Sequence, residues 1–324
     1  MAERSIIHLD LDAFFVAVER KRESKLNGIP LIIGGQSRRG VVAACSYEAR
    51  KFGVHSAMPM YLALQLCPDA KVISGDVEAY SEQSHEVTEI IANQAPAFEK
   101  SSIDEFYIDA SGMDRFFGTF KWAVGLQKRI IKDSKLPISM ALSTNKLVSK
   151  VATGEFKPNA QKQVPAGEEK NFLAPLGIEK IPMVGKQTSA FLYDMGVRTV
   201  ATLREMPLKF LMSAFGKNGI SLWNKAHGID NSPVVPYSDQ KSISTESTFE
   251  SDTIDVKKLK SILIAMVEKV GFQLREQKKL TSCLTVKIRY SNFDTETKQV
   301  HVPYTSSDHV ILNTVLELFD KLYN

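Results

Sequence analysis

The sequence predicts an α+β protein with more than one domain. A chain of 324 residues is long enough for two or three domains, each with a core of its own. Over residues 1–165, segments with strand-like alternation are interspersed with helical segments, which is typical of a sheet covered by helices. The hydrophobic content of 44% and the charged content of 24% are ordinary for a soluble globular protein.

The opening stretch SIIHLDL, residues 5–11, alternates as a strand does. The following DAFFVAVERKRE predicts a helix with Asp12 as its N-cap. Further strands are expected at IPLIIGG, GVVAACS, SSIDEFYIDAS and PISMALS, and further helices at SYEARKFGV, SAMPMYLALQLCP, 78–95, 118–134 and TNKLVSKVATGEF.

Two more regions follow this first part of the chain. Residues 166–232 lose the strand signal and predict a small helical domain, and the proline-containing segment 233–240 is interpreted as a linker. The last region, 241–324, predicts a β-α-β-β-α order, a ferredoxin-like pattern without its final strand. Its elements are expected at 242–249, 255–277, 283–290, 298–304 and 308–322.

Composition narrows the classes of function. The net charge of +4 and the pI near 8.7 permit a nucleic acid as a partner without requiring one. Three cysteines without paired spacing indicate reduced thiols and not a zinc site or a disulfide framework. The start of the chain lacks the apolar run of a signal peptide, and no stretch reaches membrane-spanning length. We therefore expect a cytoplasmic protein with no membrane partner.

Three carboxylates carry the strongest chemical signal. Asp10 ends the first strand, and Asp104 and Glu105 stand side by side in a later strand-like segment. Burying such groups is costly unless a cation lies between them, and oxygen-only ligands favour hard cations such as Mg²⁺. Two adjacent strands could bring the three together as a phosphoryl-transfer site. The alternative is that Asp10 caps a helix and the other two form a solvated turn, which is the commoner situation for acidic residues.

A second group of residues has the chemistry of an anion site. In SYEARKFG, Tyr47 and Arg50 share a helix face, and Ser46 is a plausible N-cap. Lys157 precedes a proline turn in TGEFKPNA. Together these side chains could contact a triphosphate beside the carboxylates. Each alone has the alternative of an ordinary surface side chain, which is the commoner situation.

Five motifs carry a resemblance to a known family. HLDLDAFF, SYEARKFGVHSAMP, SSIDEFYID, STNKLVSKVAT and FKPNA occur in an order and at spacings that resemble the Y-family translesion DNA polymerases of the DinB type, over nearly the whole chain. The resemblance implies a multi-domain right-hand polymerase. Its expected parts are a ferredoxin-like palm with small fingers (1–165, fingers about 11–76), a helical thumb with a helix-hairpin-helix (166–232), a linker (233–240) and a little finger (241–324).

The resemblance also implies the roles of the motif residues. Asp10, Asp104 and Glu105 match the catalytic carboxylates, which with the backbone carbonyl of Leu11 would hold two Mg²⁺ ions. The expected triphosphate contacts are Tyr47, Arg50 and Lys157, and the expected steric gate against a 2′-hydroxyl is Phe15. Small residues such as Ala43 and Ala57 would cover the nascent base pair without tight contact. Loose contact checks the shape of the base pair weakly, which implies low fidelity.

DNA contacts are expected in the two later regions. KIPMVGKQTSAFLYDMGV resembles a helix-hairpin-helix, in which Gly185 and Lys186 would contact a phosphate. Met183 replaces a glycine usual in that motif and would be strained if the backbone there needs a positive φ. In LTVKIRY, Lys287 and Arg289 would lie on the polar face of a strand and hold the DNA backbone.

The implied activity is template-directed, low-fidelity DNA synthesis in translesion synthesis and repair. The implied partners are primer-template DNA and deoxynucleoside triphosphates, with the chain acting as a monomer. Relatives continue through a final strand to a tail that binds the sliding clamp, so we expect a truncated product with an exposed sheet edge. The alternative from another class is a non-catalytic DNA-binding protein that uses the helix-hairpin-helix, and a nucleotide cyclase on a related palm ranks below both.

Overall fold

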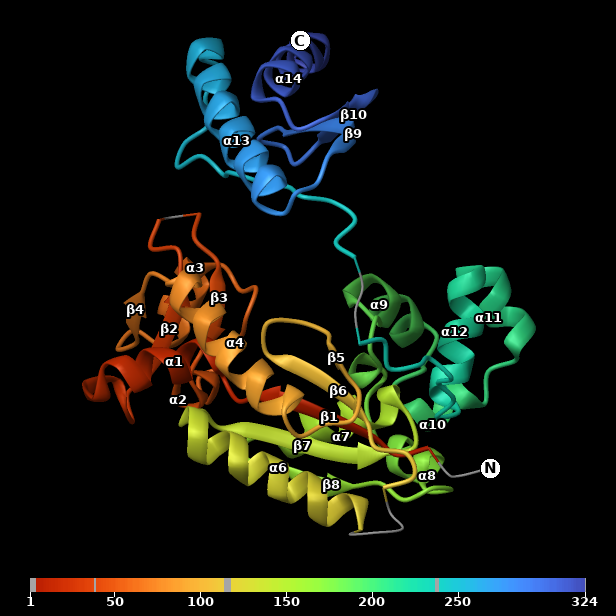
Figure 1. Ribbon diagram of the computed structural model, residues 1–324. Coiled ribbons are helices and arrows are strands. Elements are labelled where there is room, and N and C mark those ends of the chain that lie inside the picture. Colours follow the sequence, from red (N-terminus) through yellow and green to blue (C-terminus); the bar gives the residue numbers. More distant parts are fainter. Residues whose placement is uncertain (1–3, 38, 114–117, 237–238, 324) are drawn as a thin grey trace. The chain divides into compact units, whose positions relative to one another are not determined.

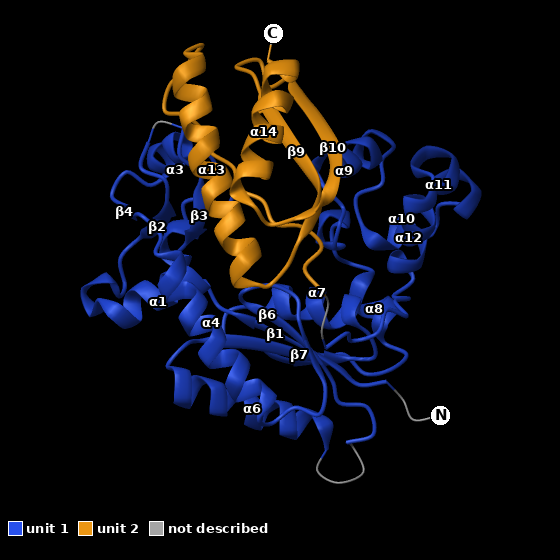
Figure 2. Ribbon diagram, turned by 45° about the horizontal axis from the view of Figure 1, so that its top comes forward, with its two compact units in different colours: residues 1–238 blue, residues 239–324 orange. Residues whose placement is uncertain are grey.

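The computed structural model describes residues 4–37, 39–113, 118–236 and 239–323. It divides into two compact units, residues 1–238 and residues 239–324 (Figure 2). None of the described helices has both the length and the apolar composition needed to cross a lipid bilayer.

The first unit is built on a five-stranded sheet in the order β5-β6-β1-β7-β8 (Figure 1). Its strands are β1 (Ile6–Leu11), β5 (Phe98–Lys100), β6 (Glu105–Asp109), β7 (Ile138–Ser143) and β8 (Gln161–Gln163). The central strand β1 pairs antiparallel with β6 on one side and with β7 on the other. Both faces of β1 are covered, so five of its six residues are buried.

Helices cover the two faces of this sheet. On one face lie α4 (Val77–Ala92) and α6 (Thr119–Ser134), which pack on Ile7, Leu9 and Leu11. On the other face lies α7 (Lys146–Phe156), which packs against β1 and β7. Because successive side chains of a strand point to opposite faces, Ile6, His8 and Asp10 point toward the α7 side.

A second, three-stranded sheet follows the order β3-β2-β4. The strands of this sheet are β2 (Leu31–Gly34), β3 (Val42–Cys45) and β4 (Lys71–Ile73). The helices of the same part of the chain are α1 (Phe14–Arg22), η1 (Ser24–Leu26), α2 (Tyr47–Arg50) and α3 (Met60–Leu66). Its separate core contains Ile32, Val42, Val54 and Met60. Over residues 12–73 the strands and helices expected from the sequence are confirmed, but the three-residue strand β4 was not expected.

Asp12 is not the N-cap of α1, so that prediction is wrong. The cap position is Ala13, with φ 44°, and no side chain caps the helix. The left-handed turn at Ala13 leaves Asp12 buried, where its carboxylate accepts hydrogen bonds from Ser139 Oγ at 2.7 Å and from the Asn159 N–H at 2.8 Å. A buried carboxylate needs such donors, and β7 and the Asn159 turn supply them.

Residues 166–232 form helices, as expected. They are α8 (Glu169–Leu173), η2 (Ile178–Lys180), α9 (Lys186–Asp194), α10 (Val200–Arg204), α11 (Leu208–Phe215) and α12 (Lys217–Ala226). Their apolar side chains share a core with Leu147 and Val151 of α7. The helical region is therefore continuous with the α7 face of the large sheet.

The second unit contains α13 (Val256–Glu276), β9 (Thr281–Arg289), β10 (Thr295–Thr305) and α14 (Asp308–Leu322). These four elements confirm the last four of the expected β-α-β-β-α order. The strand expected at 242–249 is not formed, so that prediction is wrong. Ile243 packs on the core and Glu246 pairs with Lys287, but the segment has no strand neighbour in the described part of this unit. A strand requires backbone hydrogen bonds to a neighbour as well as an alternating pattern.

Candidate active site

Two neighbouring strands bring the predicted carboxylates together. Asp10 and Glu105 are direct partners in the antiparallel pair of β1 and β6. The N–H of Leu11 donates to the carbonyl of Asp104 at 3.0 Å, so Asp104 lies just beyond the end of the same pair. Ser102 Oγ donates to Asp104 Oδ1 at 2.6 Å and orients this carboxylate. Residues 94 positions apart in the chain thus meet at one edge of the sheet, as two adjacent strands allow.

Two lysines supply positive charge to the carboxylates. Lys157 forms an ion pair with Asp10, and Lys150 Nζ lies 2.8 and 2.6 Å from the two carboxylate oxygens of Glu105. Lys150 belongs to α7, and Lys157 follows the last residue of that helix. Our sequence analysis missed Lys150. The signal was present, because lysines at 146, 150 and 157 recur at the spacing of one helix face.

The environment of Asp10 favours a bound cation or a proton. Burial raises the pKa of Asp10 to about 7, Lys157 opposes that shift, and the negative charges of Glu105 and Asp104 add to it. A buried carboxylate that resists ionisation gains most from a cation placed between it and its acidic neighbours. An oxygen from Asp10, an oxygen from Glu105 and a ring nitrogen of His8 lie within 4.8 Å of one another.

Tyr47 lies near enough to Asp12 and Asp10 to feel their charges, and Arg50 lies against Tyr47. Ser46 caps α2 by accepting a hydrogen bond from the Ala49 N–H, as expected. The Arg50 guanidinium lies 4.8 Å from the centre of the Tyr47 ring. The Tyr47 hydroxyl is buried and lacks a hydrogen-bond partner among the described residues. Burial, followed by the negative charge of Asp12, raises the pKa of Tyr47 to about 12, so this hydroxyl keeps its proton and can donate it to an incoming anion.

Phe15 and Phe14 differ in their surroundings. The Phe14 ring is buried in the core at 3% exposure, whereas Phe15 is half-buried. The Phe15 ring stacks on Tyr80, with 4.3 Å between ring centroids and an interplanar angle of 11°. The Tyr80 hydroxyl donates to Glu19 Oε1 at 2.7 Å and fixes the supporting ring. Sequence reasoning gave no signal for Tyr80, because it lies on a helix 65 positions from Phe15.

The residues expected to contact DNA belong to the helical region and to the second unit. Gly185 precedes the first residue of α9, which is Lys186. Met183 has a φ of 72° and is 93% exposed, so the positive φ considered for this position is confirmed. In the second unit, Lys287 and Arg289 lie on the exposed face of β9. Lys287 pairs with Glu246, and Arg289 Nε donates to Thr295 Oγ1 at 3.0 Å.

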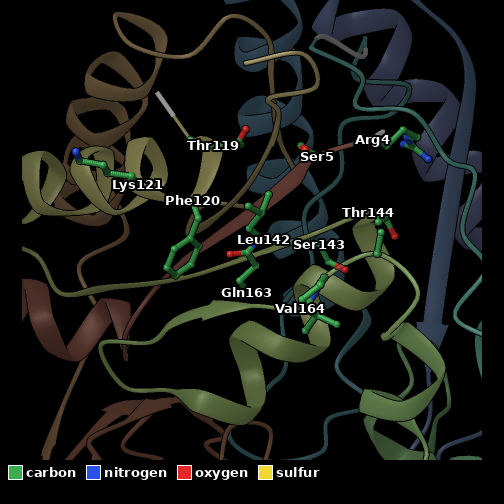
Figure 3. Close-up of a pocket in the computed structure, with 13 residues that line it drawn as sticks. Arg4, Ser5, Thr119, Phe120, Lys121, Leu142, Ser143, Thr144, Gln163 and Val164 are labelled. Carbon is green, nitrogen blue, oxygen red and sulfur yellow. The ribbon is translucent and has the colours of Figure 1, made fainter. Parts of the chain in front are cut away.

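A separate cavity of about 270 Å³ lies at the other end of β1 (Figure 3). Its lining includes Arg4 and Ser5 before β1, Thr119 at the start of α6, and Leu142 at the end of β7. None of the site residues expected from the sequence lines it. The carboxylate cluster therefore lies at the opposite end of the strand, near the smaller sheet.

Comparisons with known proteins agree with this arrangement. Family models match residues 9–154 (impB/mucB/samB family), residues 179–230 (DNA polymerase-iota, thumb domain) and residues 240–324 (impB/mucB/samB family C-terminal domain). DNA polymerase IV of Dehalococcoides mccartyi is 41% identical over 99% of this chain and 83% of its own. DNA polymerase IV of Streptococcus pneumoniae serotype 2 is 38% identical over 98% of this chain and 92% of its own. A solved Y-family DNA polymerase chimera built from Dbh and Dpo4 superposes with a TM-score of 0.86 at 24% identity, covering 98% of this chain and 93% of the other.

The fold and these matches define a polymerase of the right-hand, α+β class. The chain belongs to the impB/mucB/samB family, the Y family of DNA polymerases. The resemblance read from the five sequence motifs is confirmed.

Proposed function

We propose that this chain is a template-directed DNA polymerase of low fidelity that adds deoxynucleotides to a primer 3′ end in translesion synthesis and repair. The observation that carries the proposal is the pairing of Asp10 with Glu105 across β1 and β6, with Asp104 at the end of the same pair. A protein that only binds DNA has no use for three acidic side chains gathered at a sheet edge, because they repel the DNA backbone.

The donor set suits Mg²⁺. The carboxylates of Asp10, Asp104 and Glu105 and the carbonyl of Leu11 are hard oxygen ligands, and two ions held there would activate the primer hydroxyl and stabilise the leaving pyrophosphate. The ammonium groups of Lys150 and Lys157 pair with Glu105 and Asp10, which supports a site that requires positive charge. Mg²⁺ bound there would compete with both lysines for the carboxylate oxygens.

The nucleotide would be held by groups beside the carboxylates. Once released from Asp10, Lys157 is free to contact the triphosphate together with Arg50 and the Tyr47 hydroxyl, which has no other hydrogen-bond partner among the described residues. The Phe15 ring, supported by Tyr80, would leave no room for a 2′-hydroxyl and so select deoxynucleotides. The small, exposed side chains of Ala43 and Ala57 would contact the new base pair loosely, which favours tolerance of damaged templates.

The DNA duplex would be held by phosphate contacts without sequence preference. Gly185 and Lys186 at the start of α9 supply a backbone N–H and a cation, and Lys287 and Arg289 on β9 supply two further cations. Because binding of this kind releases counterions, affinity should fall steeply with salt.

The test is primer extension with a primer-template, deoxynucleotides and Mg²⁺. The wild type should extend the primer, and Asp104→Asn and Glu105→Gln should each reduce the rate by at least about 100-fold, the usual cost of removing one electrostatic contact to the transition state. Asp109→Asn is the matched control, because Asp109 is a carboxylate on the same strand, paired with Ile6 at the far end. Extension that persists in both site variants would refute the carboxylate assignment. DNA binding without extension by the wild type would favour the non-catalytic alternative.

A further inference from the structure

His8 is a buried polar side chain that the proposed magnesium site does not use. It is 1% exposed, and neither of its ring nitrogens has a hydrogen-bond partner among the described residues. Its ring lies 4.7 Å from the ring of Tyr107, its cross-strand partner on β6. A buried imidazole without a hydrogen-bond partner can offer a ring nitrogen to a cation.

His8 lies on the same face of β1 as Asp10, two residues earlier. One ring nitrogen of His8 and one carboxylate oxygen each from Asp10 and Glu105 lie within 4.8 Å of one another. Bonds to a transition metal are about 2.0–2.2 Å long, which places ligand atoms about 3–4 Å apart. Small side-chain rotations would therefore bring the three atoms onto one ion.

We infer that His8, Asp10 and Glu105 form a site for a divalent transition-metal cation of the Zn²⁺ and Co²⁺ type, and that this cation competes with magnesium for the two carboxylates. An imidazole with two carboxylates is a donor set that such cations prefer, whereas Mg²⁺ prefers oxygen ligands alone. The competition rests on the proposed polymerase function. The binding itself does not.

Charge in the surroundings is compatible with such a cation. Lys150 and Lys157 pair with Glu105 and Asp10, and a bound cation would compete with both lysines for the carboxylate oxygens. Lys146, the third lysine near His8, stays paired with Glu99, with its Nζ 2.7 and 2.8 Å from the two carboxylate oxygens. Two carboxylates would then balance the charge of one divalent ion, and a ring nitrogen of His8 would gain the partner that it lacks.

The test follows Co²⁺ binding by visible absorption, in the absence of DNA and nucleotide. His8→Phe keeps a ring against Tyr107, and His8→Gln keeps polarity, so one of the two should preserve the fold as judged by circular dichroism. Both variants should bind Co²⁺ at least about tenfold more weakly than the wild type, and Zn²⁺ should displace Co²⁺ from the wild type. His85→Gln is the matched control, because His85 is exposed and lies 4.0 Å from Glu89; its Co²⁺ affinity should equal that of the wild type.

Equal Co²⁺ affinity in the wild type and in the folded His8 variants would overturn the inference. A second measurement addresses the competition: Zn²⁺ should inhibit primer extension by the wild type, and added Mg²⁺ should relieve the inhibition. Inhibition that Mg²⁺ does not relieve would refute the inference that the transition-metal cation and Mg²⁺ bind the same two carboxylates. Failure of the wild type to extend a primer with Mg²⁺ alone would count against the polymerase proposal, and the Co²⁺ titration would still decide the role of His8.

Discussion

Asp10 and Glu105 face each other across β1 and β6, and each is bound by a lysine from α7 or from its C-terminal end. Lysine ammonium groups therefore neutralise the two carboxylates at which the proposed function requires divalent cations. The lysines and a bound metal therefore compete for the same carboxylates, so that the binding of one weakens the binding of the other.

Lys150→Met should strengthen the effect of Mg²⁺ on stability. The substitution keeps an unbranched side chain, one atom shorter than that of lysine, and removes the ammonium group that pairs with Glu105, at a cost of roughly 1 kcal/mol in the absence of metal. Because Mg²⁺ no longer has to displace a lysine, thermal unfolding should show a larger stabilisation by Mg²⁺ in the variant than in the wild type. An equal or smaller stabilisation would show that Lys150 does not compete with the metal.

Asp10→Asn should stabilise the chelated protein at alkaline pH. Burial raises the folded-state pKa of Asp10 to about 7 from an ordinary value of 3.8, so the folded state binds more protons than the unfolded state between these values. The contribution of Asp10 to stability is therefore present below pH 4 and is lost as pH rises toward 7. Asparagine cannot ionise and should avoid this loss, by about 2–4 kcal/mol at pH 8.

The measurement is urea unfolding of both proteins with excess chelator at pH 5 and pH 8. The advantage of Asp10→Asn should be larger at pH 8 than at pH 5. Asp109→Asn serves as the control, since Asp109 lies at the other end of β6. A pH-independent difference between the wild type and Asp10→Asn would contradict the prediction.

Phe15→Ala should admit ribonucleotides. Removing the ring opens the space above Tyr80 that a 2′-hydroxyl would need, so the ratio of kcat/KM for ribonucleotides to that for deoxynucleotides should rise by roughly 10- to 100-fold. Tyr80→Phe keeps the stacked ring and loses only the hydrogen bond to Glu19, so it should leave the ratio near the wild-type value. If Phe15→Ala keeps the wild-type ratio, the gate lies elsewhere.

Met183→Gly should stabilise the first unit. A φ of 72° is unfavourable for a side chain with a Cβ, and the Met183 side chain is 93% exposed, so it adds little packing in return. Relief of the backbone strain, less the added entropy of glycine in the unfolded chain, should raise the free energy of unfolding by about 0.5–1 kcal/mol.

Thermal unfolding checks this prediction. Val184→Gly is the matched control, because the neighbouring Val184 side chain packs on the helical core and its removal should destabilise the protein. A midpoint for Met183→Gly at or below that of the wild type would contradict the strain argument.

Much of this protein follows from local sequence. Alternation over residues 6–11 and helical periodicity over 77–92 mark elements whose apolar faces need little context to be recognised. Three-residue strands such as β4 and β8 were missed, because so short a segment carries almost no periodicity. The strand expected at 242–249 does not form, since a residue pattern indicates which side chains are buried and not which backbone groups find a partner.

The residues of the candidate active site, Asp10, Asp104 and Glu105, could be named from the chain by itself, because motif order and spacing are properties of the linear sequence. Only the tertiary structure decided that β6 lies beside β1, that Lys150 reaches Glu105, that Tyr80 supports Phe15 and that Asp12 turns inward to Ser139. The physical reason is that charge, burial and ring stacking depend on distances in space. Those distances are set by strand pairing and packing between segments far apart in the chain.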